Sequence, residues 1–176
     1  MTKILWSANN KDKNSSNLHE FEKFLSKKYN YRVSKNYPKL LNWTIKNTEK
    51  FWSSIWDFCK VKGKKNIKFK YSNTLFKNKF LVNSKLNFAE NLLSKKDNSK
   101  AITFIGENGY REVRSWKQLN YNVNKISQKL KIIGIKENDR IAGYLPNIIE
   151  TVESFIATVG IGAIWSSCSP DFGIHG

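Results

Sequence analysis

Four side chains with nucleophilic chemistry gather near the end of the sequence: Ser166, Ser167, Cys168 and Ser169. They follow an apolar segment, and α/β proteins place their ligands at the carboxyl ends of such strands. A nucleophilic serine would require the Gly-x-Ser-x-Gly elbow, which this sequence does not contain. Cys168 has only His175 close in sequence as a base, and a small half-buried cysteine on a strand is common. The residues alone therefore assemble no catalytic constellation.

Other patterns that carry chemistry are also missing from the sequence. No Gly-x-x-x-x-Gly-Lys-[Ser/Thr] phosphate loop occurs. Cys59 and Cys168 are the only cysteines and form no C-x-x-C pair, which excludes a disulfide scaffold and a zinc site of the usual spacing. Glu150 and Glu153 lie on one predicted helix, but capping explains Glu150, so no paired-carboxylate site is expected. His19 lies in the first turn of a charged helix and is expected to be solvated.

The net charge of +17, from 31 Lys and Arg against 14 Asp and Glu, belongs to the first part of the chain. Residues 1–100 carry 23 basic and 7 acidic side chains, whereas residues 101–176 carry 8 and 7. Only four basic residues are Arg, the residue that reads base edges bidentately, and Asn occurs 21 times. A compositional bias explains this charge better than selection for a polyanion, so specific nucleic-acid binding is not expected.

The segment of residues 60–80 concentrates this charge. It holds eight Lys and no acidic residue, interleaved with Phe69, Tyr71, Phe76 and Phe80. Such alternation occurs on platforms for single-stranded nucleic acid. No strand-turn repeat presents these side chains, so a solvated connector is the preferred interpretation and a nucleic-acid platform the alternative.

The elements before this connector are predicted to be helices. Asn17-Leu18-His19-Glu20 has the capping-box pattern and starts a helix that reaches about Lys28. A second helical stretch covers residues 38–45. A third is capped by Asn47 or Thr48, and its aromatic stripe is typical of a core.

The region after residue 100 has the pattern of an α/β domain. A turn at residues 106–109 between two apolar segments predicts a β-hairpin. Ser115-Trp116-Lys117-Gln118 is a capping box that starts a helix ended by Gly134.

A βαβ unit follows this helix. The strands are residues 140–145 and 163–167, and the helix between them is capped by Asn147-Ile148-Ile149-Glu150. This spacing predicts a parallel pair with a crossover helix. Parallel sheets normally carry helices on both faces, and no element after the last strand covers the second face. We therefore expect an incomplete domain, or one that another chain completes.

Targeting signals are not evident in the sequence. The first ten residues contain no apolar signal region, and the longest mostly apolar run, residues 155–165, is too short for the roughly 20 residues of a membrane span. A soluble protein of a reducing compartment without a membrane span is expected.

Three segments resemble the amino-terminal part of acetoacetate–CoA ligases, in the adenylate-forming superfamily that also includes acetyl-CoA synthetases. They are Leu86–Leu93 (LNFAENLL), Gly143–Asn147 (GYLPN) and Gly162–Gly173 (GAIWSSCSPDFG). The first two indicate the acetyl-CoA synthetase-like branch. Residues 165–173 discriminate within it, because acetyl-specific relatives carry a glycine-rich turn there. The similarity covers the whole chain but only about the first third of the family's length.

The resemblance implies an α/β fold with an amino-terminal helical arm. Residues 1–100 would be this helical region with its basic connector, and residues 101–176 the incomplete first part of the AMP-binding domain, a parallel or mixed sheet flanked by helices. A complete enzyme of this kind is cytoplasmic, activates acetoacetate with ATP and Mg²⁺, and transfers the acyl group to CoA. Its phosphate loop, nucleotide-binding residues and carboxy-terminal lysine fall outside this sequence.

The site residues implied by the resemblance are few. Ser169, Pro170 and Asp171 occupy the turn that lies beside CoA in acetyl-specific relatives, and no catalytic residue or metal ligand is assigned. The chain alone is expected to be inactive and to hold none of ATP, CoA or Mg²⁺. Two alternatives stay open: another short-chain acyl-CoA synthetase, and a non-catalytic split or decayed fragment that acts as a binding module.

Overall fold

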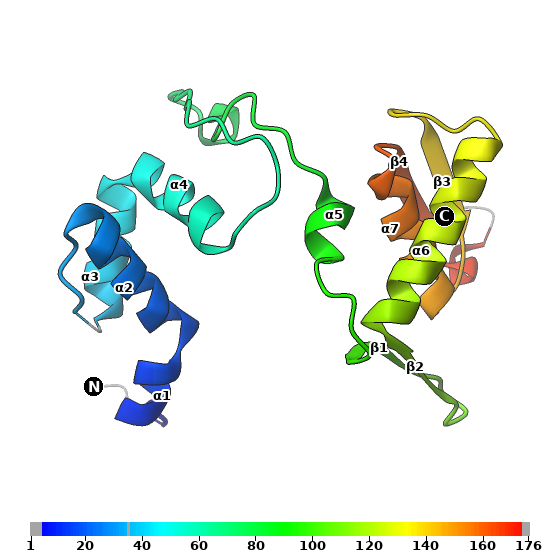
Figure 1. The fold of residues 1–176 in the computed structure, drawn as a ribbon, viewed down its shortest axis with the longest axis horizontal. Helices are drawn as coiled ribbons and strands as arrows, with labels where there is room; N and C mark the ends of the chain where they lie inside the picture. The colour runs from blue at the N-terminus through cyan, green and yellow to red at the C-terminus, as the bar shows by residue number, and fades with distance from the viewer. Residues whose placement is uncertain (1–4, 35, 174–176) are drawn as a thin grey trace. The chain divides into compact units, whose positions relative to one another are not determined.

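The computed structural model describes residues 5–34 and 36–173 (Figure 1). The α-helices are α1 (Asn10–Ser15), α2 (Asn17–Tyr29), α3 (Tyr37–Lys46), α4 (Thr48–Phe58), α5 (Phe88–Leu92), α6 (Trp116–Ile132) and α7 (Ile149–Gly160). The strands are β1 (Lys100–Ile105), β2 (Arg111–Ser115), β3 (Arg140–Tyr144) and β4 (Ile164–Cys168), and two 3₁₀ turns are η1 (Leu75–Lys77) and η2 (Pro170–Phe172). The chain divides into two compact units, Met1–Lys85 and Leu86–Gly176. The predicted domain boundary at residue 100 stays a prediction.

The first unit is helical. Helices α2, α3 and α4 enclose a core of Phe21, Leu25 and Leu40, all nearly inaccessible to solvent. The Phe21 ring meets Phe51 and Phe58 edge-on, with ring centroids 6.1 and 5.2 Å apart. Such edge-to-face aromatic pairs add to the free energy of burial. The predicted aromatic stripe of α4 therefore contributes Phe51 and Ile55 to this core, whereas Trp52 is exposed.

Two helix caps, those of α2 and α7, differ from the sequence prediction. Helix α2 is capped by Ser16, whose Oγ accepts a hydrogen bond from the His19 N–H at 3.2 Å. The capping prediction at Asn17 is wrong, because Ser16 already has the extended conformation that an N-cap requires and Asn17 is the first helical residue. The prediction at Asn147 is also wrong, since Ile148 takes the N-cap position of α7 with no side-chain bond.

The connector after α4 is more ordered than the sequence indicates. Two isolated antiparallel bridges cross it, between Lys64 and Lys85 and between Lys70 and Lys79. The turn η1 lies between the inner pair, and Figure 1 shows this stretch as a loop with one short helical turn. The connector thus has a backbone fold of its own without a regular strand.

The second unit begins with α5 and the β1–β2 hairpin. The two strands are antiparallel, with Thr103 opposite Val113, as the turn pattern predicts. The capping box at Ser115 and Gln118 is present in both directions, with bonds of 2.9 and 3.2 Å. Helix α6 follows and packs against α7. Together with α5 these helices bury the core of the unit: Ala89, Leu119, Val123, Ile156 and Ala157.

Strands β3 and β4 form the predicted parallel pair, with helix α7 between them in sequence. The register places Arg140 opposite Ile164 and Tyr144 opposite Cys168. The described residues therefore contain two small sheets, one antiparallel and one parallel, beside helices. Helices and strands are thus combined in this unit, as the sequence predicts for an α/β fold.

Glycine is required at one position of this parallel pair. A Cβ at Gly143 would lie 2.6 Å from Cη2 of Trp165, because the indole of β4 covers the backbone of β3. The indole also meets Phe155 of α7 edge-on, at 6.4 Å between ring centroids. The packing of α7 on the sheet through Trp165 therefore requires a residue without a side chain at position 143.

None of the helices within residues 5–34 and 36–173 combines the length and the apolar character that a membrane span requires.

Candidate functional site

The carboxyl ends of β3 and β4 meet at one edge, because the strands are parallel. Tyr144 ends β3 and Cys168 ends β4, and the backbone N–H of Leu145 donates to the carbonyl of Cys168 at 3.3 Å. The chain then turns through Ser169 into η2. Open α/β sheets bind ligands at this edge. The predicted residues Ser169, Pro170 and Asp171 therefore lie at the edge where a ligand would be expected.

Hydrogen bonds within the turn fix its shape. The hydroxyl of Ser169 donates to Oδ2 of Asp171 at 2.7 Å and accepts from the Asp171 N–H at 3.3 Å. Pro170 occupies the first position of η2, where the missing N–H costs nothing. The turn thus holds the Asp171 carboxylate through a side-chain bond that depends on Ser169.

A second contact ties the turn to the neighbouring strand. The phenol of Tyr144 donates to the carbonyl oxygen of Pro170 at 2.9 Å. Sequence reasoning singled out the segment around Tyr144 only for its resemblance and missed this bond, because the two residues are 26 positions apart. The turn is therefore held from within by Ser169 and from β3 by Tyr144.

The other candidate residues at this edge are the possible nucleophiles of β4. Ser166, Ser167 and Cys168 are exposed to solvent, and Cys168 is a free thiol. His175, the base that the sequence offers to Cys168, lies outside the described residues. The structure thus assembles no nucleophile–base pair from these side chains.

An ion network around the buried Glu153 supports the unit that carries the turn. Arg114 of β2 donates from Nε to Glu153 of α7 at 3.0 Å and from Nη1 to Glu112 at 2.5 Å, and Nη2 lies 3.4 Å from Glu150. The amide of Asn122 in α6 donates to the same Glu153 oxygen at 2.8 Å. Burial would lower the pKa of Arg114, but the bonds and charges of the carboxylates outweigh burial and raise it.

We interpret this network as stabilising the fold, because its hydrogen bonds join the hairpin to α6 and α7. The sequence does not predict this network. The available signal was Glu153, a carboxylate three residues before Ile156 and therefore beside the buried face of α7. A buried carboxylate requires a partner from another element, and a single sequence does not identify that partner.

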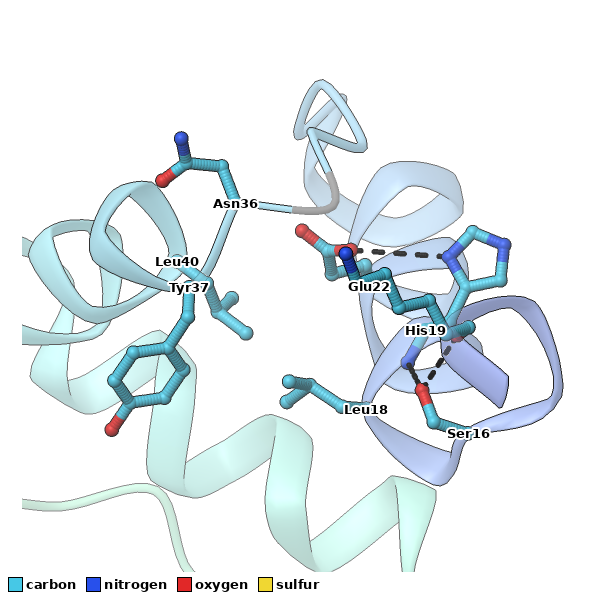
Figure 2. Close-up of a pocket in the computed structure, with 8 residues that line it drawn as sticks. Ser16, Leu18, His19, Glu22, Asn36, Tyr37 and Leu40 are labelled. Atoms are coloured by element: carbon cyan, nitrogen blue, oxygen red, sulfur yellow. Dashed lines mark hydrogen bonds and ion pairs between the residues drawn. The ribbon is translucent and has the colours of Figure 1, made fainter. Parts of the chain in front are cut away.

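A pocket of about 190 Å³ lies in the first unit (Figure 2). Its lining includes the side chains labelled in the figure: Ser16, Leu18, His19, Glu22, Asn36, Tyr37 and Leu40. His19 Nδ1 lies 3.9 Å from Oε2 of the buried Glu22 and has no hydrogen-bond partner among the residues that the structure describes. The expectation that His19 is solvated is wrong, since only 11 % of its side chain is exposed. The imidazole is largely shielded from solvent and lines the same pocket as Asn36 and Tyr37.

The described residues offer few ligands for the ATP, CoA and Mg²⁺ that the resemblance implies. No group of three or more His, Cys, Asp or Glu side chains comes together in residues 5–34 and 36–173, so these residues form no cluster for Mg²⁺. The turn at Ser169 offers a hydroxyl, a carboxylate and backbone groups. These fit a neutral amide or a thiol, whereas the Asp171 carboxylate would repel a phosphate.

Comparison with known proteins identifies relatives of this chain. Residues 89–175 match the family of AMP-binding enzymes. An acetoacetyl-coenzyme A synthetase of Rhizobium meliloti is 34 % identical over 98 % of this chain, and that of Xenopus tropicalis is 32 % identical over 99 %. A malonamoyl-CoA synthetase of Penicillium aethiopicum is 29 % identical over 92 %. The chain spans about a quarter of the length of these curated relatives, 26 % of the first two.

A solved structure has the same fold over nearly the whole chain. Acetoacetyl-CoA synthetase from Streptomyces lividans superimposes with a TM-score of 0.88 and covers 98 % of this chain, which in turn covers 27 % of that protein. The sequence identity is 24 %, so this match establishes the fold alone.

Proposed function

We propose that this chain is the amino-terminal part of an acid–thiol ligase for acetoacetate, because it is similar to acetoacetyl-CoA synthetases over nearly its whole length and residues 89–175 match the family of AMP-binding enzymes. The observation that carries this proposal is the parallel β3–β4 pair ending in the Ser169–Asp171 turn, within a chain related to these enzymes over nearly its whole length.

The proposed reaction has two steps. The carboxylate of acetoacetate attacks the α-phosphate of ATP, which releases pyrophosphate and forms an acyl-adenylate. The thiol of CoA then attacks the acyl carbonyl and displaces AMP. Charge neutralisation and alignment at phosphorus dominate the first step. The sequence contains no phosphate loop, and we therefore assign no role in that step to residues of this chain.

We assign the turn to the second step. Ser169, Pro170 and Asp171 would lie beside the pantetheine arm of CoA, where a hydroxyl and a carboxylate can receive hydrogen bonds from amide N–H groups. Tyr144 would act on CoA only through the turn, as a positioning residue. The CoA phosphates would bind elsewhere, because the exposed Asp171 carboxylate disfavours a second negative charge.

A second candidate is another short-chain acyl-CoA synthetase. The malonamoyl-CoA synthetase of Penicillium aethiopicum is 29 % identical, close to the 30–34 % of the acetoacetyl-CoA synthetases. Identity in this range does not separate acyl groups. Reading the gene beyond codon 176 and assaying the longer product with acetoacetate, acetate and malonamate discriminates between the two candidates.

A chimeric enzyme tests whether this chain is a working part of a ligase. The corresponding first quarter of the Rhizobium meliloti enzyme would be replaced by these 176 residues. We expect acetoacetate-dependent exchange of labelled pyrophosphate into ATP and formation of acetoacetyl-CoA. A folded chimera without either activity would overturn the proposal and favour the non-catalytic binding module.

A further inference from the structure

The loop of residues 64–85 is here called the basic loop. It combines a high density of lysines with an apolar tip, and neither feature has a role in the proposed ligase reaction. Its backbone is fixed by paired bonds: Lys64 and Lys85 exchange bonds of 2.7 and 3.0 Å, and Lys70 and Lys79 exchange bonds of 2.9 and 2.8 Å. Lys65 anchors the loop to α4 by donating to the carbonyl of Ser53 at 2.9 Å and to Asp57 at 2.6 Å. Hydrogen bonds thus fix the backbone of the loop and its attachment to α4.

Both bridges place like charges opposite each other. Residues that exchange both backbone bonds in an antiparallel pair project their side chains to the same face, and like charges there destabilise the pair. Lys64, Lys70, Lys79 and Lys85 are exposed and make no ion pair within the described residues. Residues 58–89 contain no acidic side chain at all. An anionic partner would relieve this repulsion.

The tip of the loop is apolar. Leu75 and Phe76, adjacent in η1, are 84 % and 85 % exposed. The turn beneath them is held by the Ser72 N–H, which donates to the Asn78 side chain at 2.7 Å. An ordered turn that presents two adjacent apolar side chains between lysines is typical of a segment that enters a membrane interface.

The aromatic rings of the loop argue against a nucleic-acid platform. Phe69 and Phe80 meet edge-on at 6.1 Å, and Phe80 meets Trp52 of α4 at 5.7 Å. Because Phe69 and Phe80 pack on each other and the tip pairs Phe76 with the non-aromatic Leu75, the loop presents no continuous row of rings for successive bases. We propose that the basic loop docks on an anionic phospholipid surface, with lysines against the lipid phosphates and Leu75 and Phe76 in the headgroup region. This binding would be peripheral and would leave the chain outside the bilayer.

The experiment is co-sedimentation of the whole 176-residue chain with vesicles at physiological ionic strength. One vesicle is pure phosphatidylcholine, and the other contains about one-third phosphatidylglycerol. Each Lys near such a surface strengthens binding about fivefold. We therefore expect binding to the anionic vesicles only, with an approximately tenfold or larger loss in the K70Q/K79Q variant and a clear loss in L75S/F76S.

Matched controls separate the loop from the general positive charge. K117Q/K129Q removes the same charge from α6, and Ile132→Ser removes an apolar side chain that is 77 % exposed. Both controls should bind the anionic vesicles like the unaltered chain. Equal losses in loop and control variants, or no binding to either vesicle, would overturn the proposal. Tighter binding to a single-stranded RNA oligomer than to the vesicles would also overturn it, in favour of a nucleic-acid surface.

Discussion

The guanidinium of Arg114 in β2 donates a hydrogen bond to the Glu153 carboxylate in α7, with 3.0 Å between Nε and Oε1. Glu153 is buried, at 3 % exposure, and Arg114 also meets Glu112. The bond joins the hairpin to the helix that crosses between β3 and β4. The packing of α7 against the hairpin therefore depends on this ion pair.

Removing the arginine should strongly destabilise the second unit. Arg114→Ala leaves Glu153 buried without its cation, and breaking a buried ion pair in this way costs about 3 kcal/mol or more. Urea denaturation measures the free energy of unfolding, and we expect this loss there. Arg111→Ala, at an exposed position of the same strand, is the control and should change it by less than about 0.5 kcal/mol. Equal effects of the two variants would contradict a structural role for the network.

Gly143→Ala should also destabilise the parallel pair. The new methyl group would lie 2.6 Å from the Trp165 ring, and such overpacking costs about 1–3 kcal/mol. The control is Gly160→Ala, whose added Cβ would meet only Ala89 at 3.4 Å. Thermal unfolding monitored by tryptophan fluorescence should show a lower midpoint for Gly143→Ala alone. Adding Trp165→Phe should restore part of the loss, because the smaller ring makes room for the methyl group.

Local patterns account for what could be predicted from the sequence. The capping box at Ser115 and the turn of the hairpin each depend on residues within a few positions of each other. The parallel pair follows from two apolar segments separated by a helix. The bond from Tyr144 to Pro170, by contrast, depends on how β3 and β4 align, and the Arg114–Glu153 pair spans 39 positions.

For the same reason, the sequence predicts only part of the candidate site. Ser169, Pro170 and Asp171 were identified by resemblance, and their internal bonds are local. The low exposure of His19 could not be predicted from the charged helix that contains it, because it lines a pocket with residues of another element, Asn36 and Tyr37. Sequence periodicity describes the face of one helix, whereas burial depends on the element that packs against that face.

The helical unit should lose stability in acid through Asp57. Burial would raise the pKa of Asp57, but bonds from Lys28 and Lys65 and their charges outweigh burial and lower the pKa below its ordinary 3.8. A lowered pKa contributes stability above the unfolded-state value that is lost as the pH falls through the folded-state value. We therefore expect this loss below about pH 4. It should be less than about 1 kcal/mol, because Asp57 is partly exposed.

The Asp57→Asn variant isolates this contribution. Its unfolding free energy, followed by the helical circular dichroism signal, should fall less steeply below about pH 4 than that of the unaltered chain. Glu107→Gln, in the exposed hairpin turn, is the control and should keep the full slope. The bond to Asp57 also raises the pKa of Lys28 above its ordinary 10.5. This bond therefore stabilises the folded chain below pH 10.5, and the stabilisation is lost as the pH rises above that value. Asp57→Asn should remove this stabilisation. Identical pH profiles of Asp57→Asn and the unaltered chain would contradict the assignment.

Ser169→Ala tests the role of the turn in the chimeric enzyme. The variant loses both bonds to Asp171, and one such hydrogen bond is worth about 0.5–1.5 kcal/mol. We expect the KM for CoA to rise about three- to tenfold, with little change in acetoacetate-dependent pyrophosphate exchange, which precedes CoA attack. Ser94→Ala, at an exposed position before β1, should change neither quantity. An equal loss in both reactions would instead indicate a general loss of structure.

The 176-residue chain should form no acyl-adenylate by itself. Phosphoryl transfer requires donors held in fixed positions around the triphosphate, and the sequence contains no phosphate loop. The lysines of the basic loop do not replace it, because exposed ammonium groups on flexible side chains lack the fixed geometry that the transition state requires. We expect acetoacetate-dependent exchange of labelled pyrophosphate into ATP from the chimera and none from the chain alone. Exchange by the purified chain, abolished by a variant at the Ser169 turn, would show that the turn takes part in the first step.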